Sequence, residues 1–153
     1  MVLDVSRALQ QLGESFPFCI EQETLTDRQA QRLPTGVSIG GVRVDGFFIG
    51  ARDIVFVRGS ANARIVCECA RCLQPVELTI SAGVHEVYGH TPDPNEPERY
   101  AFHGHMLDIE EQVYSTLLLA LPIRTLCRED CAGLCQTCGA NLNEGACTCH
   151  GSD

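Results

Sequence analysis

The feature that most constrains this chain is the placement of its ten cysteines among 153 residues. Six of them lie in residues 127–149, a C-terminal stretch with few large apolar side chains. A stretch of this kind buries too little apolar surface to fold without a crosslink. The overall cysteine content is below that of small secreted disulfide scaffolds, and the N-terminus lacks the basic-then-apolar order of a secretory signal. We therefore expect a cytoplasmic protein whose reduced thiols bind a metal.

Four thiols of this tail have the spacing of a single metal site. Cys135 and Cys138 enclose two residues and precede Gly139, so that a tight turn can direct both sulfurs at one ion. Cys147 and Cys149 return after a turn-rich connection. Four thiolates suit tetrahedral zinc. We therefore expect a zinc site, as a C-terminal zinc knuckle, formed by Cys135, Cys138, Cys147 and Cys149.

Six thiols exceed what one zinc ion needs, so the choice of ligands stays open. Cys127 and Cys131 are either spare or replace the last cysteine pair, and His150 is another conceivable ligand. An iron–sulfur cluster is a competing use of the same thiolates, although the tail offers little apolar cover for one.

The middle of the chain carries a second thiol pair, Cys69 and Cys72. Its C-x-x-C spacing invites a thioredoxin-like interpretation, but that chemistry needs the first thiol at a helix N-terminus. The alternating residues Val76–Ile80 predict a strand or turn here instead. A second metal site that joins Cys69 and Cys72 to Cys127 and Cys131 is an alternative, and it requires two distant half-sites to meet in the fold.

The sequence predicts an α+β fold that is mainly β, an antiparallel meander or partly open barrel with one packed helix. Short runs rich in strand-forming residues are separated by glycines, and Gly46 and Gly59 are interpreted as turns. The expected strands are 37–44, 53–58, 61–67 and 76–80, with 84–88 as an extension of the last. Residues 2–5 and 16–21 are capable of adding strands, and the proline-rich stretch 89–98 is expected to be an exposed loop.

One helix is expected at about residues 108–121. Asp108 is a suitable N-cap and Glu111 follows three residues later, which is a capping-box arrangement. An apolar stripe of Ile109, Val113, Leu117 and Leu121 then follows, with Pro122 behind it, and it favours packing on the sheet. We expect a β-rich domain over residues 1–126 and a cysteine-rich metal-binding tail over residues 127–153.

The charge of the chain argues against a protein that binds nucleic acid through a generally basic surface. The chain has eleven basic residues, all of them arginine, and 20 acidic residues, which gives a net charge of −9. Residues 37–76 are the exception, because five arginines there outnumber three acids. A local RNA-facing patch of arginines is therefore the form that any phosphate contact would take. Its candidate members are Arg52, Arg58, Arg64 and Arg71.

Catalytic motifs are not recognised in this sequence. It contains no phosphate loop, nucleophile elbow or dinucleotide fingerprint, and its histidines follow no metalloprotease pattern. No apolar run approaches the roughly 20 residues that a membrane helix needs. We expect neither an enzyme, nor a small-molecule substrate, nor a membrane partner.

Three separated motifs together resemble the bacterial and plastid YceD family. They are C-A-R-C-L-Q-P-V at Cys69–Val76, L-L-L-A-L-P at Leu117–Pro122, and the cysteine-rich segment that starts at Leu126. The resemblance implies a non-enzymatic role in the accumulation, processing or assembly of large-subunit ribosomal RNA. The partner it implies is precursor large-subunit RNA or a ribosomal protein.

Two functions from other classes remain as alternatives. The first is an iron–sulfur or thiol redox protein that uses the same cysteines. The second is a protein–protein adaptor that binds a basic ribosomal protein through acidic residues without touching RNA, which would accommodate the net charge of the chain.

Overall fold

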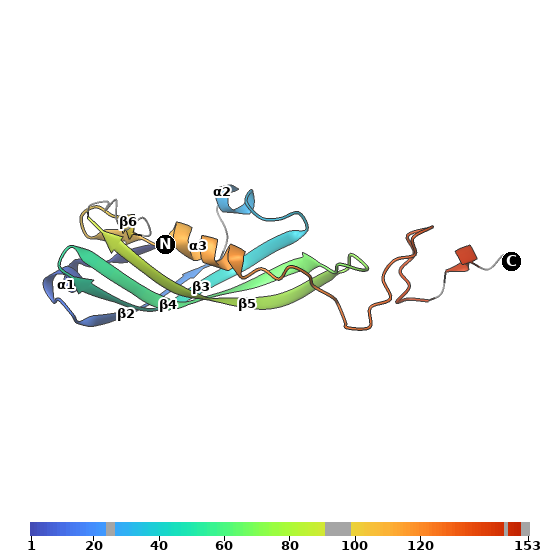
Figure 1. Ribbon diagram of the computed structural model, residues 1–153, viewed down its shortest axis with the longest axis horizontal. Coiled ribbons are helices and arrows are strands. Elements are labelled where there is room, and N and C mark those ends of the chain that lie inside the picture. Colours follow the sequence, from blue (N-terminus) through green and yellow to red (C-terminus); the bar gives the residue numbers. More distant parts are fainter. Residues whose placement is uncertain (24–26, 91–98, 146, 151–153) are drawn as a thin grey trace.

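Three long strands form the body of the protein. The computed structural model describes residues 1–23, 27–90, 99–145 and 147–150. The three long strands are β3 (Val37–Ala51), β4 (Ile54–Glu68) and β5 (Pro75–Gly89), each of 15 residues. β2 (Ser15–Gln22) pairs with β3, and β6 (Arg99–Ala101) runs parallel to β5. The resulting sheet has the order β2-β3-β4-β5-β6 and is antiparallel except at β6 (Figure 1).

Shorter elements close one side of this sheet. β1 (Val2–Asp4) pairs with β7 (Met106–Asp108) in a small second sheet. The helices are α1 (Ser6–Gln10), α2 (Asp27–Ala30), α3 (Glu110–Leu119) and the 3₁₀ turn η1 (Thr148–His150). Figure 1 shows the long sheet curled beneath α3, with the other face left open. The predicted mainly β fold, a partly open antiparallel sheet with one packed helix, is confirmed. Of the two N-terminal stretches, residues 16–21 add a strand to this sheet as part of β2, whereas β1 forms a strand outside it.

The interpretation of Gly46 and Gly59 as turns is wrong. Both lie inside long strands, directly opposite one another in the register of β3 and β4. A Cβ atom on Gly46 would lie 2.2 Å from the carbonyl oxygen of Arg58, so glycine is needed here for close approach of the two backbones. The connection between the strands lies at Arg52 and Asp53 instead, where Arg52 has a positive φ of 55°. The four expected short strands are therefore three long ones, and residues 84–88 continue the last of them as expected.

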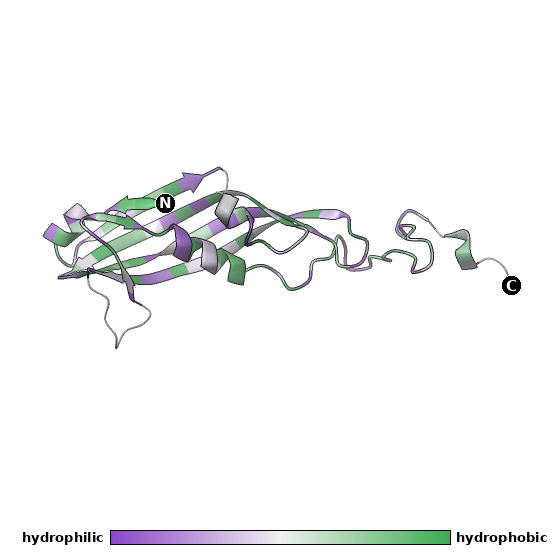
Figure 2. Cartoon of the chain, turned by 90° about the horizontal axis from the view of Figure 1, so that it is seen from above, coloured by the Kyte–Doolittle hydropathy of each residue, from purple (hydrophilic) through white to green (hydrophobic). Residues whose placement is uncertain are grey.

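The core lies between α3 and the concave side of the sheet. Alternate residues of β4 point into it, including the buried Val55, Val57 and Ile65 (Figure 2 shows the apolar bands along the strands). The predicted helix stripe is confirmed, since Val113 and Leu117 are fully buried against these strands. Burial of this stripe, rather than helix propensity, holds α3 in place.

The start of α3 differs from the sequence prediction. The N-cap is Ile109, which makes no side-chain cap bond, so the prediction of Asp108 as the N-cap is wrong by one residue. Asp108 Oδ1 still accepts a hydrogen bond of 3.0 Å from the backbone N–H of Glu110, the first residue of the helix. The reciprocal bond from Glu111 is absent from the described contacts, because Glu111 pairs with Arg32 instead. Of the helices in the described part of the chain, none is long and apolar enough to cross a membrane. Residues 91–98 of the predicted loop lie outside the described residues.

Candidate metal centres

A first group of four thiols lies where the C-terminal segment passes the loop between β4 and β5. The Sγ atoms of Cys69, Cys72, Cys127 and Cys131 all lie within 4.8 Å of one another, and the group could hold a metal ion. Two of the Sγ–Sγ distances are 3.8 Å, for Cys69 and Cys131, and 3.6 Å, for Cys72 and Cys127. All of these side chains except that of Cys127 are buried. The two half-sites that the sequence left as an alternative are therefore brought together.

Backbone hydrogen bonds shape the two halves of this group. The loop after β4 is closed by the Leu73 N–H, which donates to the Cys69 carbonyl at 2.9 Å. The C-terminal segment is held against this loop by a bond of 2.8 Å from the Ala70 N–H to the Thr125 carbonyl. Figure 1 shows this segment leaving α3 and running past the side of the sheet where β4 ends and β5 begins. Contacts outside the thiols therefore already align the two pairs.

Arg71, which the sequence placed in an RNA-facing patch, belongs to this metal centre. Its guanidinium Nη1 donates to the carbonyl of Cys131 at 2.8 Å, and its own carbonyl accepts from the Leu134 N–H at 3.2 Å. These contacts connect the loop that carries Cys72 to the tail. Arg71 lies in a loop rather than on the sheet, and its side chain links the loop after β4 to the C-terminal segment that carries Cys131.

Thiolate formation is favoured at two positions of the first group. Burial raises the pKa of the Cys69 thiol, but the backbone N–H groups of Arg71, Cys127 and Cys72 outweigh this effect and lower the pKa to about 6. At Cys131 burial is likewise outweighed, by the Asn143 side chain and the Gly133 N–H, and the pKa is lowered. Two of the sulfurs are thus prepared as metal ligands by neutral hydrogen-bond donors.

The second group contains the four tail thiols expected from their spacing. The Sγ atoms of Cys135, Cys138, Cys147 and Cys149 all lie within 4.8 Å of one another. The Sγ atoms of Cys147 and Cys135 lie 3.3 Å apart. Gly139 has the positive φ of 74° that the tight turn requires, and its N–H donates to the Cys135 carbonyl at 2.9 Å.

This second group is more open to solvent than the first. Cys135 is buried, whereas Cys138 and Cys149 are exposed. The backbone N–H groups of Cys138 and Thr137 lower the pKa of Cys135 to about 6. The side chain of His150 lies outside the described residues, so its proposed role as a ligand remains a prediction. This group also could hold a metal ion.

Asn143 connects the two groups, and sequence reasoning missed it. Its Nδ2 donates to Cys131 Sγ at 3.4 Å, and its Oδ1 accepts from the Ala132 N–H at 2.8 Å and from Arg128 Nη2 at 2.8 Å. Because Asn143 lies in the connection between the cysteine pairs of the second group, it ties that connection to a ligand of the first. Its proximity in sequence to the cysteines was the only available signal.

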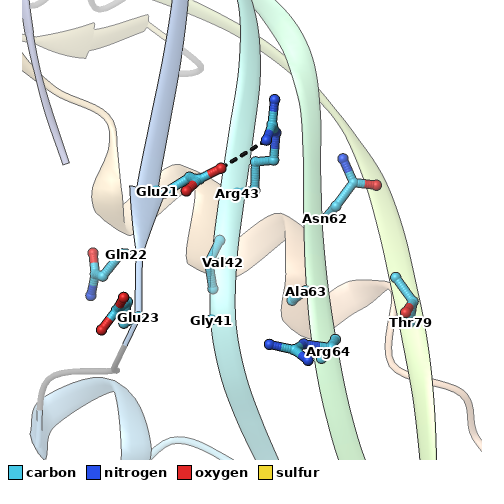
Figure 3. Close-up of a pocket in the computed structure, with 10 residues that line it drawn as sticks. All are labelled: Glu21, Gln22, Glu23, Gly41, Val42, Arg43, Asn62, Ala63, Arg64 and Thr79. Carbon is cyan, nitrogen blue, oxygen red and sulfur yellow. Dashed lines mark hydrogen bonds and ion pairs between the residues drawn. The ribbon is translucent and has the colours of Figure 1, made fainter.

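The remaining arginine candidates do not form one patch. Arg52 occupies the turn between β3 and β4, whereas Arg58 and Arg64 both lie on the open face of β4. Six residues of strand separate the latter two, which is about 20 Å. Figure 3 shows Arg43 beside Asn62 on the face of the sheet opposite α3, with Arg64 farther along β4, and Arg43 forms an ion pair of 2.7 Å with Glu21.

The other four histidines, His85, His90, His103 and His105, take no part in either group. Within the described residues, the groups able to hold a metal ion contain cysteine alone. His90 stacks on Phe102 with ring centroids 4.2 Å apart. This contact gives His90 a packing role.

A curled antiparallel sheet with two four-thiol groups beyond one end defines a mainly β protein with candidate tetrathiolate metal centres. The family model described as "Large ribosomal RNA subunit accumulation protein YceD" matches residues 57–153, well over half of the chain. The chain therefore belongs to this family, which confirms the resemblance seen in the sequence. All eight cysteines of the two groups lie inside the matched region.

The chain is also similar to several curated proteins. An uncharacterized protein of Mycobacterium tuberculosis is 35% identical over 95 residues, which cover 58% of this chain and 45% of the relative. An uncharacterized protein of Mycobacterium leprae is 31% identical over 94 residues, which cover 58% of this chain and 43% of the relative. A chloroplastic large ribosomal RNA subunit accumulation protein YCED homolog of Zea mays is 41% identical over 44 residues, 28% of this chain and 15% of the relative. The chain thus spans less than half the length of these relatives, and no solved structure matches it.

Proposed function

We propose that this protein is a non-enzymatic cytoplasmic factor that promotes the accumulation, processing or assembly of large-subunit ribosomal RNA. The family match carries this proposal. We further propose that its two four-thiol groups each bind one zinc ion, and that precursor large-subunit RNA or a ribosomal protein is its partner.

The spacing of the sulfurs supports zinc over a cluster. A tetrahedral ion with metal–sulfur distances of about 2.3 Å places its sulfurs about 3.8 Å apart. The Sγ–Sγ separations of 3.3, 3.6 and 3.8 Å are close to this value. An iron–sulfur cluster interposes several iron and sulfide atoms between the cysteines, which requires a wider arrangement than four sulfurs within 4.8 Å of one another.

The role of the metals would be structural. An ion held by Cys69, Cys72, Cys127 and Cys131 would crosslink the loop after β4 to the segment that follows α3, two regions more than 50 residues apart. The second ion would give the core-poor tail a fixed shape. The protein would thereby present the tail in one orientation relative to the sheet, as an assembly partner requires.

Depletion and complementation in the native cells test the ribosomal role. We expect depletion to lower large-subunit ribosomal RNA relative to small-subunit RNA, and the wild-type chain to restore the ratio. A Cys69→Ser/Cys131→Ser variant should restore it poorly, whereas Cys19→Ser, which changes a cysteine outside both groups, should restore it fully. An unchanged RNA ratio after depletion would refute the proposal.

The net charge of −9 supports a second candidate, an adaptor that binds a basic ribosomal protein and meets RNA only indirectly. Crosslinking in cells followed by denaturing purification separates the two. RNA attached under denaturing conditions supports direct contact. A ribosomal protein that co-purifies only under native conditions, with no crosslinked RNA, supports the adaptor.

A further inference from the structure

The open face of the sheet carries a row of aromatic and basic side chains. In the strand register, Phe47 of β3 lies opposite Arg58 of β4, which lies opposite His85 of β5. Residues directly opposite one another point to the same face, so these three side chains stand side by side across the sheet. Phe56, two residues before Arg58 on β4, extends the row along the strand and lies opposite Ile49.

The aromatic rings of this row are accessible. Phe47 is 39% exposed and Phe56 is 37% exposed, although both are large apolar side chains in the middle of long strands. The helix α3 packs on the other face, against the buried residues of β4 and β5. Within the described residues these two rings therefore present apolar surface to solvent on the open face of the curled sheet.

Two arginines on this face are available to a phosphate ligand. Arg58 and Arg64 form no ion pair with any residue in the described part of the chain. Two acids of the same face, Glu21 and Asp45, are both held by Arg43, at 2.7 and 3.8 Å (Figure 3 shows the pair with Glu21). A third acid of this face, Glu77, lies opposite Val66 and away from Arg58, so the guanidinium of Arg58 has the fewest acidic neighbours.

A strip of small polar residues lies between Arg58 and Arg64. Ser60 and Ser81 lie with their Oγ atoms 3.3 Å apart, and Asn62 Nδ2 donates to Ser60 Oγ at 3.4 Å. Gly83 adds no side chain, and the His85 ring lies over it, with Nε2 3.1 Å from where a Cβ would be. The face is therefore shallow along about 20 Å of β4, with hydroxyl and amide groups exposed at its centre.

We propose that this face binds single-stranded RNA, with unpaired bases stacked on Phe47 and Phe56 and phosphates contacted by Arg58 and Arg64. This inference rests on the proposed ribosomal function and names the surface that would carry it. Aromatic rings on an open sheet reach bases only when these are unpaired. Two cations are few for a duplex, whose binding depends on neutralising many phosphates. An apolar protein interface would in turn be interrupted by Arg58, His85 and the serines.

Binding of labelled RNA by the full chain in its reduced, metal-bound form tests the proposal. The probes are 12-nucleotide oligouridine and oligoadenosine, with a 12-base-pair RNA duplex as comparison, in fluorescence anisotropy at two salt concentrations. We expect both single strands to bind more tightly than the duplex. Phe47→Ala and Phe56→Ala should each weaken binding by about fivefold or more. Arg58→Ala should weaken binding and reduce the salt slope by about one.

Matched controls lie away from this face. Leu119→Ala removes an exposed apolar side chain from α3, and Arg124→Ala removes a charge from the segment that follows it. Neither should change RNA affinity by more than about twofold. Circular dichroism and metal content of each variant confirm that the fold is retained.

Three results would overturn the inference. They are no binding of either single strand up to about 100 µM, binding that Phe47→Ala and Phe56→Ala leave unchanged, or equal binding of the duplex. Altered sedimentation of the phenylalanine variants without any RNA binding would identify a protein interface instead. A chain that binds no RNA but still restores the ribosomal RNA ratio would overturn this surface and leave the proposed function standing.

Discussion

Two leucines of α3 allow the packing of this helix to be tested with one substitution. Leu117 is fully buried against the sheet, whereas Leu119, two residues later, is 88% exposed. Leu→Ala changes the intrinsic helix preference by nearly the same amount at both positions. Any difference in the free energy of unfolding between the variants therefore measures burial alone.

The expected difference is large. Truncation of a fully buried leucine costs about 3–5 kcal/mol, because apolar contacts are lost and a cavity remains. An exposed substitution stays within about 0.5 kcal/mol. With an m-value of about 2 kcal/mol per molar urea, Leu117→Ala should lower the urea midpoint by about 1.5–2.5 M and Leu119→Ala by less than 0.3 M.

Tyrosine fluorescence provides the assay, because the chain has no tryptophan and two of its three tyrosines, Tyr88 and Tyr114, are buried. Far-ultraviolet circular dichroism should give the same midpoints if unfolding is cooperative. Equal destabilisation by the two substitutions would refute the assigned orientation of α3. A larger effect of Leu119→Ala would place the wrong face of the helix on the sheet.

Three further substitutions test other parts of the structure. Gly46→Ala should destabilise the protein by about 2 kcal/mol or more in urea unfolding, because its Cβ would clash with a carbonyl oxygen 2.2 Å away. Gly40→Ala, whose Cβ would have its nearest contact at 3.5 Å, should cost less than half as much. Similar losses for the two variants would contradict the strand register. Asn143→Ala should speed the loss of metal to a chelator, because Cys131 loses a hydrogen-bond donor, and an unchanged rate would remove Asn143 from the site. Asp108→Ala should cost about 1 kcal/mol and Asp108→Asn much less, and equal losses would show that the hydrogen bond from the Glu110 N–H to Asp108 is not what stabilises the start of α3.

The sequence predicted the second thiol group more readily than the first for a physical reason. The ligand candidates of the second group lie within 15 residues, so that local turn chemistry brings them together. The first group joins Cys72 to Cys127 across 55 residues, and only the path of β5 and α3 decides whether they meet. Spacing could propose this pairing as an alternative but could not select it.

Glycine explains the incorrect strand boundaries. A glycine in a β-rich sequence marks either a turn or a close approach of two backbones, and single residues do not distinguish these. The alternation of small apolar residues through Val55, Val57, Ala61, Ala63 and Ile65 continued across Gly59 and was the better signal. The charge count likewise could not show that Arg71 faces the tail, because the direction of a loop side chain depends on its tertiary contacts.

Metal stoichiometry is the most direct test of the two tetrathiolate zinc centres. Elemental analysis of the reduced, anaerobically purified protein should find two zinc ions per chain and no labile sulfide. The variants Cys69→Ser/Cys72→Ser and Cys135→Ser/Cys138→Ser should each retain one ion, and Cys19→Ser should retain both. Iron with labile sulfide, or a zinc content that neither double variant lowers, would contradict the assignment of two tetrathiolate zinc centres.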